Sequence, residues 1–179
     1  RFTPGAYRDG GSLKASDDRC DVCALPCEWK YTGNVYALKR PAVCARCIAS
    51  GALATFLADG HFALHDVELD EADPALEAEF LQRTPGVACF NPFEWPVLDG
   101  RPLAFIGYGP DAGVVDNPDA QAAIAAAYEE MGWGGVESNP SDPYALVFKE
   151  LDGGRYRAVI DLDWLAPGRL TWAFPAAPL

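Results

Sequence analysis

Apolar residues recur at the spacing of a helix face in residues 44–57 and in residues 74–83. A third helix is predicted through Met131 by a cap at Asp116 or Asn117, by Pro118 near its start and by Gly132 after its end. An apolar residue every three or four positions is typical of a helix that packs one face on a core. Asp73 followed by Pro74 is a strong start for the second helix, whereas Gly51 weakens the first without forbidding it.

Shorter apolar runs predict strands. Residues 103–108 have the pattern of a buried strand, and residues 144–151 and 156–162 flank an Asp-Gly-Gly turn, which is a strong hairpin signal. A smaller hairpin is expected over residues 28–38, with its turn at the Thr-Gly-Asn sequence of 32–34. The other stretches predict irregular structure: a lead-in over residues 1–19, an aromatic and proline-rich segment over 87–102, and a docked or frayed tail over 167–179.

Four of the six cysteines form two Cys-x2-Cys pairs separated by twenty residues: Cys20, Cys23, Cys44 and Cys47. Two such pairs supply the four sulfurs of a tetrahedral zinc site, so one structural Zn²⁺ is expected. A four-sulfur site leaves no open position for a substrate, which makes it structural and not catalytic. Disulfides and inert buried thiols are the alternatives. Cys27 is an extra thiol that can substitute as a ligand, and Cys89 is expected in the core.

These elements predict an α+β fold. Residues 1–60 are expected to form a zinc-ribbon-like module with a helix. Residues 61–179 are expected to form an acidic mixed α/β body that ends in a C-terminal β-hairpin. The module is expected to pack on the body, so that the two make one compact unit.

The charge of the chain lies in its middle. Of 26 acidic and 14 basic side chains, residues 1–60 carry 6 and 8, residues 61–140 carry 15 and 2, and residues 141–179 carry 5 and 4. A net charge of -12 argues against general binding to nucleic acid or to anionic membranes. The acidic middle is either a set of solvated faces or a surface that attracts a cationic partner. No stretch has the 18–20 or so apolar residues of a membrane helix, so a cytoplasmic location is expected.

No catalytic constellation is recognisable, so the protein is predicted not to be an enzyme. His61 and His65 are expected at the surface or at helix ends. The glycines after residue 106 miss the spacing of a dinucleotide-binding loop. Trp95, Trp133, Trp164 and Trp172 are expected in packing roles, with an exposed cluster near Trp95 as the alternative. The alternative to a non-enzymatic role is an enzyme or small-molecule-binding domain with a pocket in the aromatic region 90–108.

Several motifs occur in an order and spacing that resemble the CbrC family of small bacterial proteins. They are CDVC at 20–23, YTGNVYA at 31–37, CARCIASGALATF at 44–56, RTPG at 83–86, AFIGYG at 104–109 and VFKELDGGRYRA at 147–158. The resemblance points to no established catalytic activity. It implies an association with tolerance to colicin-type toxins and a likeness to immunity proteins.

The resemblance also implies a difference in metal content. Members of that family often carry four further cysteines, at positions occupied here by Asp99, Leu103, Glu150 and Gly153. Loss of all four together is expected if they form a second metal site, because half a site is useless. One zinc is therefore expected here, where relatives can hold two.

The leading hypothesis is a non-enzymatic zinc-binding immunity protein that binds and neutralises a cognate, basic bacterial toxin in the cytoplasm. A regulatory scaffold has the same sequence features. The predicted contact is electrostatic and involves an acidic stretch: Asp66, Glu68, Asp70, Glu71, Asp73, Glu77 and Glu79.

Overall fold

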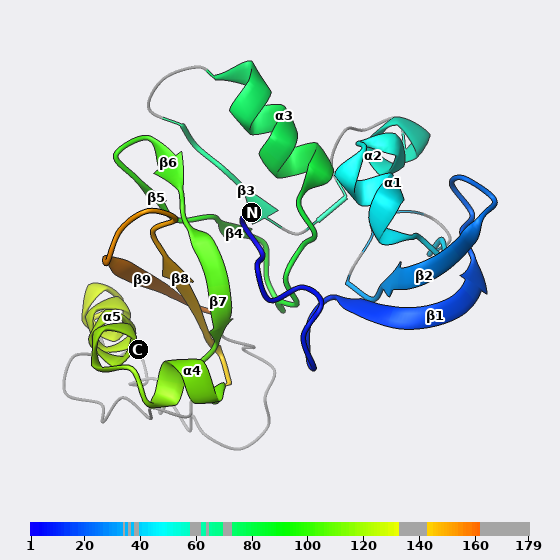
Figure 1. Ribbon diagram of the computed structural model, residues 1–179. Helices are drawn as coiled ribbons and strands as arrows, with labels where there is room; N and C mark the ends of the chain where they lie inside the picture. The colour runs from blue at the N-terminus through cyan, green and yellow to red at the C-terminus, as the bar shows by residue number, and fades with distance from the viewer. Residues whose placement is uncertain are drawn as a thin grey trace, which may run out of the picture.

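A computed structural model describes residues 1–33, 35, 37, 40–57, 62–63, 65–69, 73–132 and 143–161 of the chain. Helices and small sheets are mixed, as the predicted α+β class requires (Figure 1). The elements are, in order, β1 (Leu13–Arg19), β2 (Pro26–Tyr31), α1 (Ala45–Ala49), α2 (Ala52–Leu57), β3 (His65–Asp66), α3 (Pro74–Arg83), β4 (Phe93–Glu94), β5 (Val97–Leu98), β6 (Arg101–Pro102), β7 (Ala104–Tyr108), α4 (Ala112–Val115), α5 (Pro118–Glu130), β8 (Ala145–Lys149) and β9 (Tyr156–Ile160).

The first hairpin joins β1 to β2 and differs from the predicted one. Leu13 lies opposite Tyr31, and Ala15 lies opposite Trp29, so the strand partner of β2 precedes it in the chain. The expected lead-in over residues 1–19 is therefore wrong for β1. This strand is polar and almost wholly exposed, so no apolar alternation marks it. Of the turn predicted at 32–34, Asn34 lies outside the described residues.

The helix predicted over 44–57 is divided into α1 and α2. Gly51 has a φ of 75°, a left-handed conformation that glycine adopts without steric cost, and its N–H donates to the carbonyl oxygen of Ile48. The two helices turn at this point, so the prediction of one continuous helix is wrong. None of the helices in the described ranges is both long and apolar enough to span a bilayer.

The two longer helices are confirmed together with their caps. The Asp73 carboxylate accepts hydrogen bonds from the N–H groups of Ala75 and Leu76, at 3.1 and 3.0 Å, and starts α3. The Asn117 side chain accepts from the two N–H groups at the start of α5. Asn117, and not Asp116, is therefore the cap of this helix.

The body is built around the antiparallel sheet β7–β8–β9, which confirms the predicted strand and C-terminal hairpin. Strand β8 is central and buried on both faces. Leu146 and Phe148 face an aromatic core, whereas Ala145 and Val147 face α5. This alternation follows from the period of two along a strand. Helix α5 lies against one face of the sheet (Figure 1), and the aromatic core packs on the other.

The aromatic core gathers around Trp95, which is fully buried in the segment predicted to be irregular. Its indole N–H donates to the carbonyl oxygen of Leu103 at 2.8 Å. His65 packs against Trp95 and Phe80, with ring centroids 4.7 and 5.2 Å away. His65 is therefore buried in β3, which corrects the expected surface or helix-end position. His61, Trp133, Trp164, Trp172 and the tail over 167–179 lie outside the described residues.

The module and the body interlock through single residues. Phe2 packs in the aromatic core of the body, whereas Phe62 packs with the module. The hydroxyl oxygen of Tyr31, at the end of β2, accepts a hydrogen bond from the N–H of Gly86. The division of the chain into two parts at residue 60 stays a prediction. These contacts join residues before position 60 to residues after it.

Candidate metal centre

The first cysteine pair lies in the turn of the β1–β2 hairpin. Cys20 follows β1 directly, its carbonyl oxygen accepts from the N–H of Ala24, and its N–H donates to the carbonyl oxygen of Leu25, both at 2.9 Å. Ala24 has a φ of 58°, which reverses the chain tightly after Cys23. This turn directs both cysteine side chains toward the same point.

The second cysteine pair is held beside the first by backbone contacts. Cys44 forms a bridge with Lys30 of β2 and stands at the N-cap of α1. Asp21 binds Ala42 twice: its N–H donates to the carbonyl oxygen of Ala42, and its carboxylate accepts from the N–H of Ala42. These backbone contacts therefore bring the two cysteine pairs together although twenty residues separate them in the sequence.

The four sulfur atoms form a compact group. Cys20 and Cys47 have their Sγ atoms 3.7 Å apart, Cys23 and Cys44 have theirs 3.8 Å apart, and Cys44 and Cys47 have theirs 3.5 Å apart. All four lie within 4.8 Å of one another. Four sulfurs at a Zn–S distance of about 2.3 Å define a tetrahedron with edges of about 3.8 Å. This group, hereafter the cysteine cluster, can therefore hold a metal ion.

The local electrostatics differ among the four thiols. Burial works against ionisation of Cys20, but hydrogen bonds from the backbone N–H groups of Cys23, Cys44 and Val22 outweigh it and lower its pKa to about 6. Burial, followed by hydrogen bonds with the neighbouring thiols, raises the pKa of Cys47. Four thiolates in so small a volume repel one another, and a bound cation removes that repulsion.

The other two cysteines stand apart from the group of four. Cys27 is buried in β2, where burial and then the charges of Cys20 and Cys44 raise its pKa to about 11. Cys89 is half-buried against the aromatic core, as expected, and burial raises its pKa to about 11. All six thiols are free in this structure, so it contains no disulfide among them.

The acidic stretch proposed from the sequence is exposed over most of its described length. Asp66, Glu68, Asp73 and Glu77 are exposed, and Glu79 is partly buried in an ion pair with Arg1 at 2.7 Å. Asp70 and Glu71 lie outside the described residues. The parallel pairing of β3 with β4 adds Glu94, which lies opposite Asp66 and is exposed.

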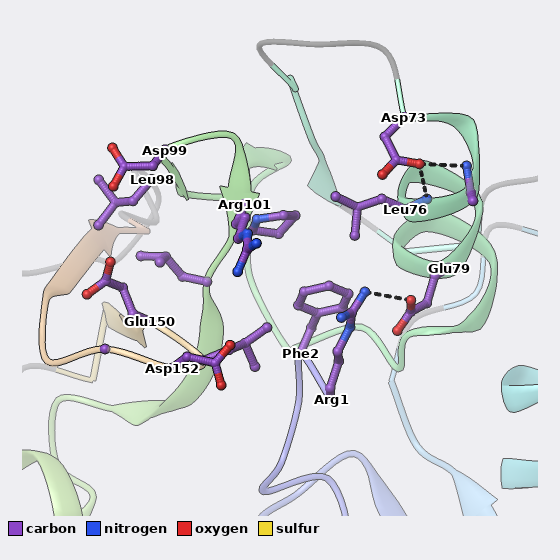
Figure 2. Close-up of a pocket in the computed structure, with 15 residues that line it drawn as sticks. Arg1, Phe2, Asp73, Leu76, Glu79, Leu98, Asp99, Arg101, Glu150 and Asp152 are labelled. Atoms are coloured by element: carbon purple, nitrogen blue, oxygen red, sulfur yellow. Dashed lines mark hydrogen bonds and ion pairs between the residues drawn. The ribbon is translucent and has the colours of Figure 1, made fainter.

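A cleft of about 820 Å³ opens between α3, the first two residues, the β5–β6 turn and the β8–β9 turn (Figure 2). Five carboxylates line it: Asp73, Glu79, Asp99, Glu150 and Asp152. Arg1 and Arg101 line it as well, and Leu76, Leu98 and Leu103 are among its apolar residues. Region 90–108, in which a pocket was expected, contributes Leu98, Asp99, Arg101, Pro102 and Leu103 to the lining, and Phe2 is its aromatic residue.

Asp99, Leu103, Glu150 and Gly153, the four positions at which cysteines are expected in the CbrC family, all line this cleft. Two of these positions, Glu150 and Asp99, are connected by Arg155. The Nε of Arg155 donates to Glu150 Oε1 at 2.8 Å, and its guanidinium also forms an ion pair with Asp99. These hydrogen bonds hold the pKa of Glu150 below its usual range. An arginine cation thus lies between residues of the β5–β6 and β8–β9 turns.

Comparison with known proteins places this architecture in a family. The model of the "Uncharacterised protein family (UPF0167)" matches residues 1–161, which include the cysteine cluster and the whole described body. The chain belongs to the UPF0167 family. It is 35% identical over 126 residues to UPF0167 protein Mb2317 of Mycobacterium bovis and to UPF0167 protein MT2352 of Mycobacterium tuberculosis. The aligned region covers 69% of this chain and 67% of each relative.

No solved structure gave a significant match. The names of the two mycobacterial relatives state neither a ligand nor an activity. The resemblance of this UPF0167 protein to the CbrC family therefore stays a prediction, as does the immunity role that the resemblance implies.

Sequence reasoning missed Arg155, Glu94 and Arg1 as members of these charged surfaces. Arg155 lies 56 residues from Asp99, and Arg1 lies 78 residues from Glu79. The sequence contains no periodic signal for pairs this distant. The acidic excess of residues 61–140 was the available signal for Glu94, but only the β3–β4 pairing places it beside Asp66.

Proposed function

We propose that this UPF0167 protein is a non-enzymatic, zinc-stabilised binding protein whose acidic surface binds a basic partner protein. In the bacterial cytoplasm that partner is a cognate toxin, and binding neutralises it. The protein then acts as an immunity protein.

The observation that carries this proposal is a group of exposed carboxylates that form no ion pair with another residue in the described part of the chain. Glu79, Asp99 and Glu130 form ion pairs with arginines. Five others on and beside the acidic stretch form no ion pair with another described residue: Asp66, Glu68, Asp73, Glu77 and Glu94. A concentrated negative field accelerates encounter with a basic protein and selects against acidic ones.

Zinc is the proposed occupant of the cysteine cluster. Thiolate sulfur is a soft ligand, and four of them in a tetrahedral arrangement suit Zn²⁺. When bound, zinc supplies cross-links among four sulfurs. Cys20, Cys44 and Cys47 are buried and share the module's core, so these links hold the first hairpin against α1. Four protein ligands leave no open coordination position, which favours a structural role.

The cleft extends the acidic surface and is the proposed docking point for a lysine or arginine of the partner. Asp73 and Glu79 belong both to the acidic stretch and to the cleft. Leu76 and Leu98 provide apolar surface for the aliphatic part of such a side chain, and Asp152 lies at the same cleft without an ion pair to a described residue (Figure 2).

Protection of cells by co-expression tests the proposal. Basic toxin domains encoded beside the gene are expressed alone or with this protein, and survival is counted. Survival should increase with the unaltered chain and fall with the double variant Glu68→Lys, Glu77→Lys. The matched control is Asp116→Lys, Glu129→Lys, which changes the net charge equally on exposed residues at the α4–α5 side of the sheet.

Two outcomes contradict the proposed role. One is the absence of protection against every such toxin. The other is equal protection by both double variants, which removes the acidic stretch as the contact even if the protein is protective. Binding measured in parallel should weaken as salt rises, because ions screen exposed charges beyond about 10 Å at 0.1 M.

The cleft itself favours a second candidate, a small-molecule-binding domain. Its volume of about 820 Å³ is in the range of ligand pockets, and it mixes charged and apolar residues. Small organic cations that raise the melting temperature of the unaltered protein, but not of an Asp152→Asn variant, support this candidate. Absence of any such stabilisation contradicts it.

A further inference from the structure

The cysteine cluster has one side open to solvent. At most 3% of the surface of Cys20, Cys44 and Cys47 is exposed to solvent, whereas Cys23 is exposed. The Sγ atom of Cys23 lies 3.8 Å from that of Cys44. A small solute that reaches the cluster from water therefore meets Cys23 first, with the Cys44 sulfur directly behind it.

We infer that Cys23 is a site of oxidative modification at which a hydroperoxide opens the cluster and releases its metal. The inference rests on the zinc proposed above and adds a chemical reactivity to it. The substrate class is a small hydroperoxide, either hydrogen peroxide or an alkyl hydroperoxide, which can reach the exposed Cys23 from water.

The reaction balances in two steps. The Cys23 thiolate attacks the terminal oxygen of the hydroperoxide, the O–O bond breaks, and a sulfenic acid and an alkoxide or hydroxide form. The Cys44 thiolate then attacks the Cys23 sulfur, the S–O bond breaks, and a disulfide and hydroxide form. Two thiolates give two electrons to the peroxide, and two protons from solvent complete one alcohol or water molecule and a second water molecule.

The geometry selects Cys44 as the partner of Cys23. The Cys44 sulfur contacts two others, that of Cys47 at 3.5 Å and that of Cys23 at 3.8 Å, so it is the buried sulfur in direct contact with the exposed Cys23. The sulfurs of Cys23 and Cys44 must approach from 3.8 Å to a bond length of about 2 Å, a small movement for the exposed turn that carries Cys23. A disulfide between them leaves two sulfurs, which is too few for a closed tetrahedral site.

The test uses the full-length, zinc-loaded protein and hydrogen peroxide. Zinc release is followed with a chromogenic chelator, and the products are mapped by mass spectrometry. We expect one zinc released for each Cys23–Cys44 disulfide formed. The variant Cys23→His keeps a ligand for the metal but removes the exposed sulfur, and it should release zinc about tenfold more slowly. Cys27→Ser and Cys89→Ser are matched controls that should release zinc at the unaltered rate.

A second measurement covers the case in which Cys23→His binds no zinc. A sulfenic-acid probe added to the unaltered protein during oxidation should label Cys23 before any other cysteine. Release from Cys23→His at the unaltered rate, or first labelling at a different cysteine, overturns the inference and leaves the zinc proposal intact. Absence of zinc from the unaltered protein overturns both.

Discussion

The hydroxyl oxygen of Tyr31 accepts a hydrogen bond of 3.1 Å from the backbone N–H of Gly86, 55 residues further along the chain. Tyr31 is buried at the end of β2, where its ring also meets Phe62 edge-on. The N–H of Tyr31 donates to the carbonyl oxygen of Val43, the residue before Cys44. One side chain thus connects the strand beside the cysteine cluster to the segment that follows α3.

Replacement Tyr31→Phe should lower the free energy of unfolding by about 1–3 kcal/mol, because it leaves the buried N–H of Gly86 without this acceptor. Urea unfolding measures the change. Tyr7→Phe is the matched control, since Tyr7 is exposed, and its change should be close to zero. Equal effects of the two substitutions would contradict the assigned role of Tyr31.

Replacement Trp95→Phe should destabilise the body by about 2–4 kcal/mol, because it leaves a cavity and removes the hydrogen bond to Leu103. Thermal unfolding measures the change, with Trp29→Phe as the exposed control. The indole fluorescence of Trp95 should also be shifted to short wavelength, as expected for a ring without solvent contact. An effect no larger than that of Trp29→Phe would argue against Trp95 as the centre of the core.

Replacement Asn117→Ala should cost about 1 kcal/mol, because the side chain caps α5 through two backbone N–H groups. The neighbouring change Asp116→Ala removes an exposed carboxylate that makes no capping bond to α5, so its effect should be close to zero. The pair is measured by urea unfolding. The reverse order of effects would assign the cap to Asp116.

The carboxyl group of Glu150 should titrate below the usual range of a glutamate, because Arg155 donates hydrogen bonds to its ionised form. Its pKa is lower in the folded than in the unfolded chain, so the ion pair favours folding above the unfolded pKa. That contribution disappears as the pH falls through the folded value. NMR titration of the side-chain carboxyl measures the pKa, and Arg155→Gln should raise it toward the ordinary value. An unchanged pKa in Arg155→Gln would contradict the ion pair.

Local signals in the sequence predicted much of the body. Asp73-Pro74 and Asn117-Pro118 start α3 and α5, and the Asp-Gly-Gly turn precedes β9, because caps and turns depend on residues next to one another. Strand β1 could not be predicted in the same way. Its side chains are mostly polar and exposed, and it is a strand because β2 pairs with it across the cysteine turn.

In the candidate site as well, features set by neighbouring residues could be predicted, whereas features set by distant segments could not. Two Cys-x2-Cys pairs identify their own members, and the structure brings their sulfurs within 4.8 Å. The exposure of Cys23 and the position of Arg155 between Asp99 and Glu150 depend on how distant segments pack. His65 illustrates the limit, since a single polar residue in the sequence gives no sign that three aromatic rings will surround it.

The zinc content of the purified protein and of its Cys44→Ser variant, determined by elemental mass spectrometry, tests the central claim most directly. Cys44 is fully buried and contacts the sulfurs of both Cys23 and Cys47. The unaltered chain should contain one zinc ion, and the variant should contain close to none. Unaltered protein that is folded and free of zinc, or a Cys44→Ser variant that retains the full amount, would contradict the proposed metal centre.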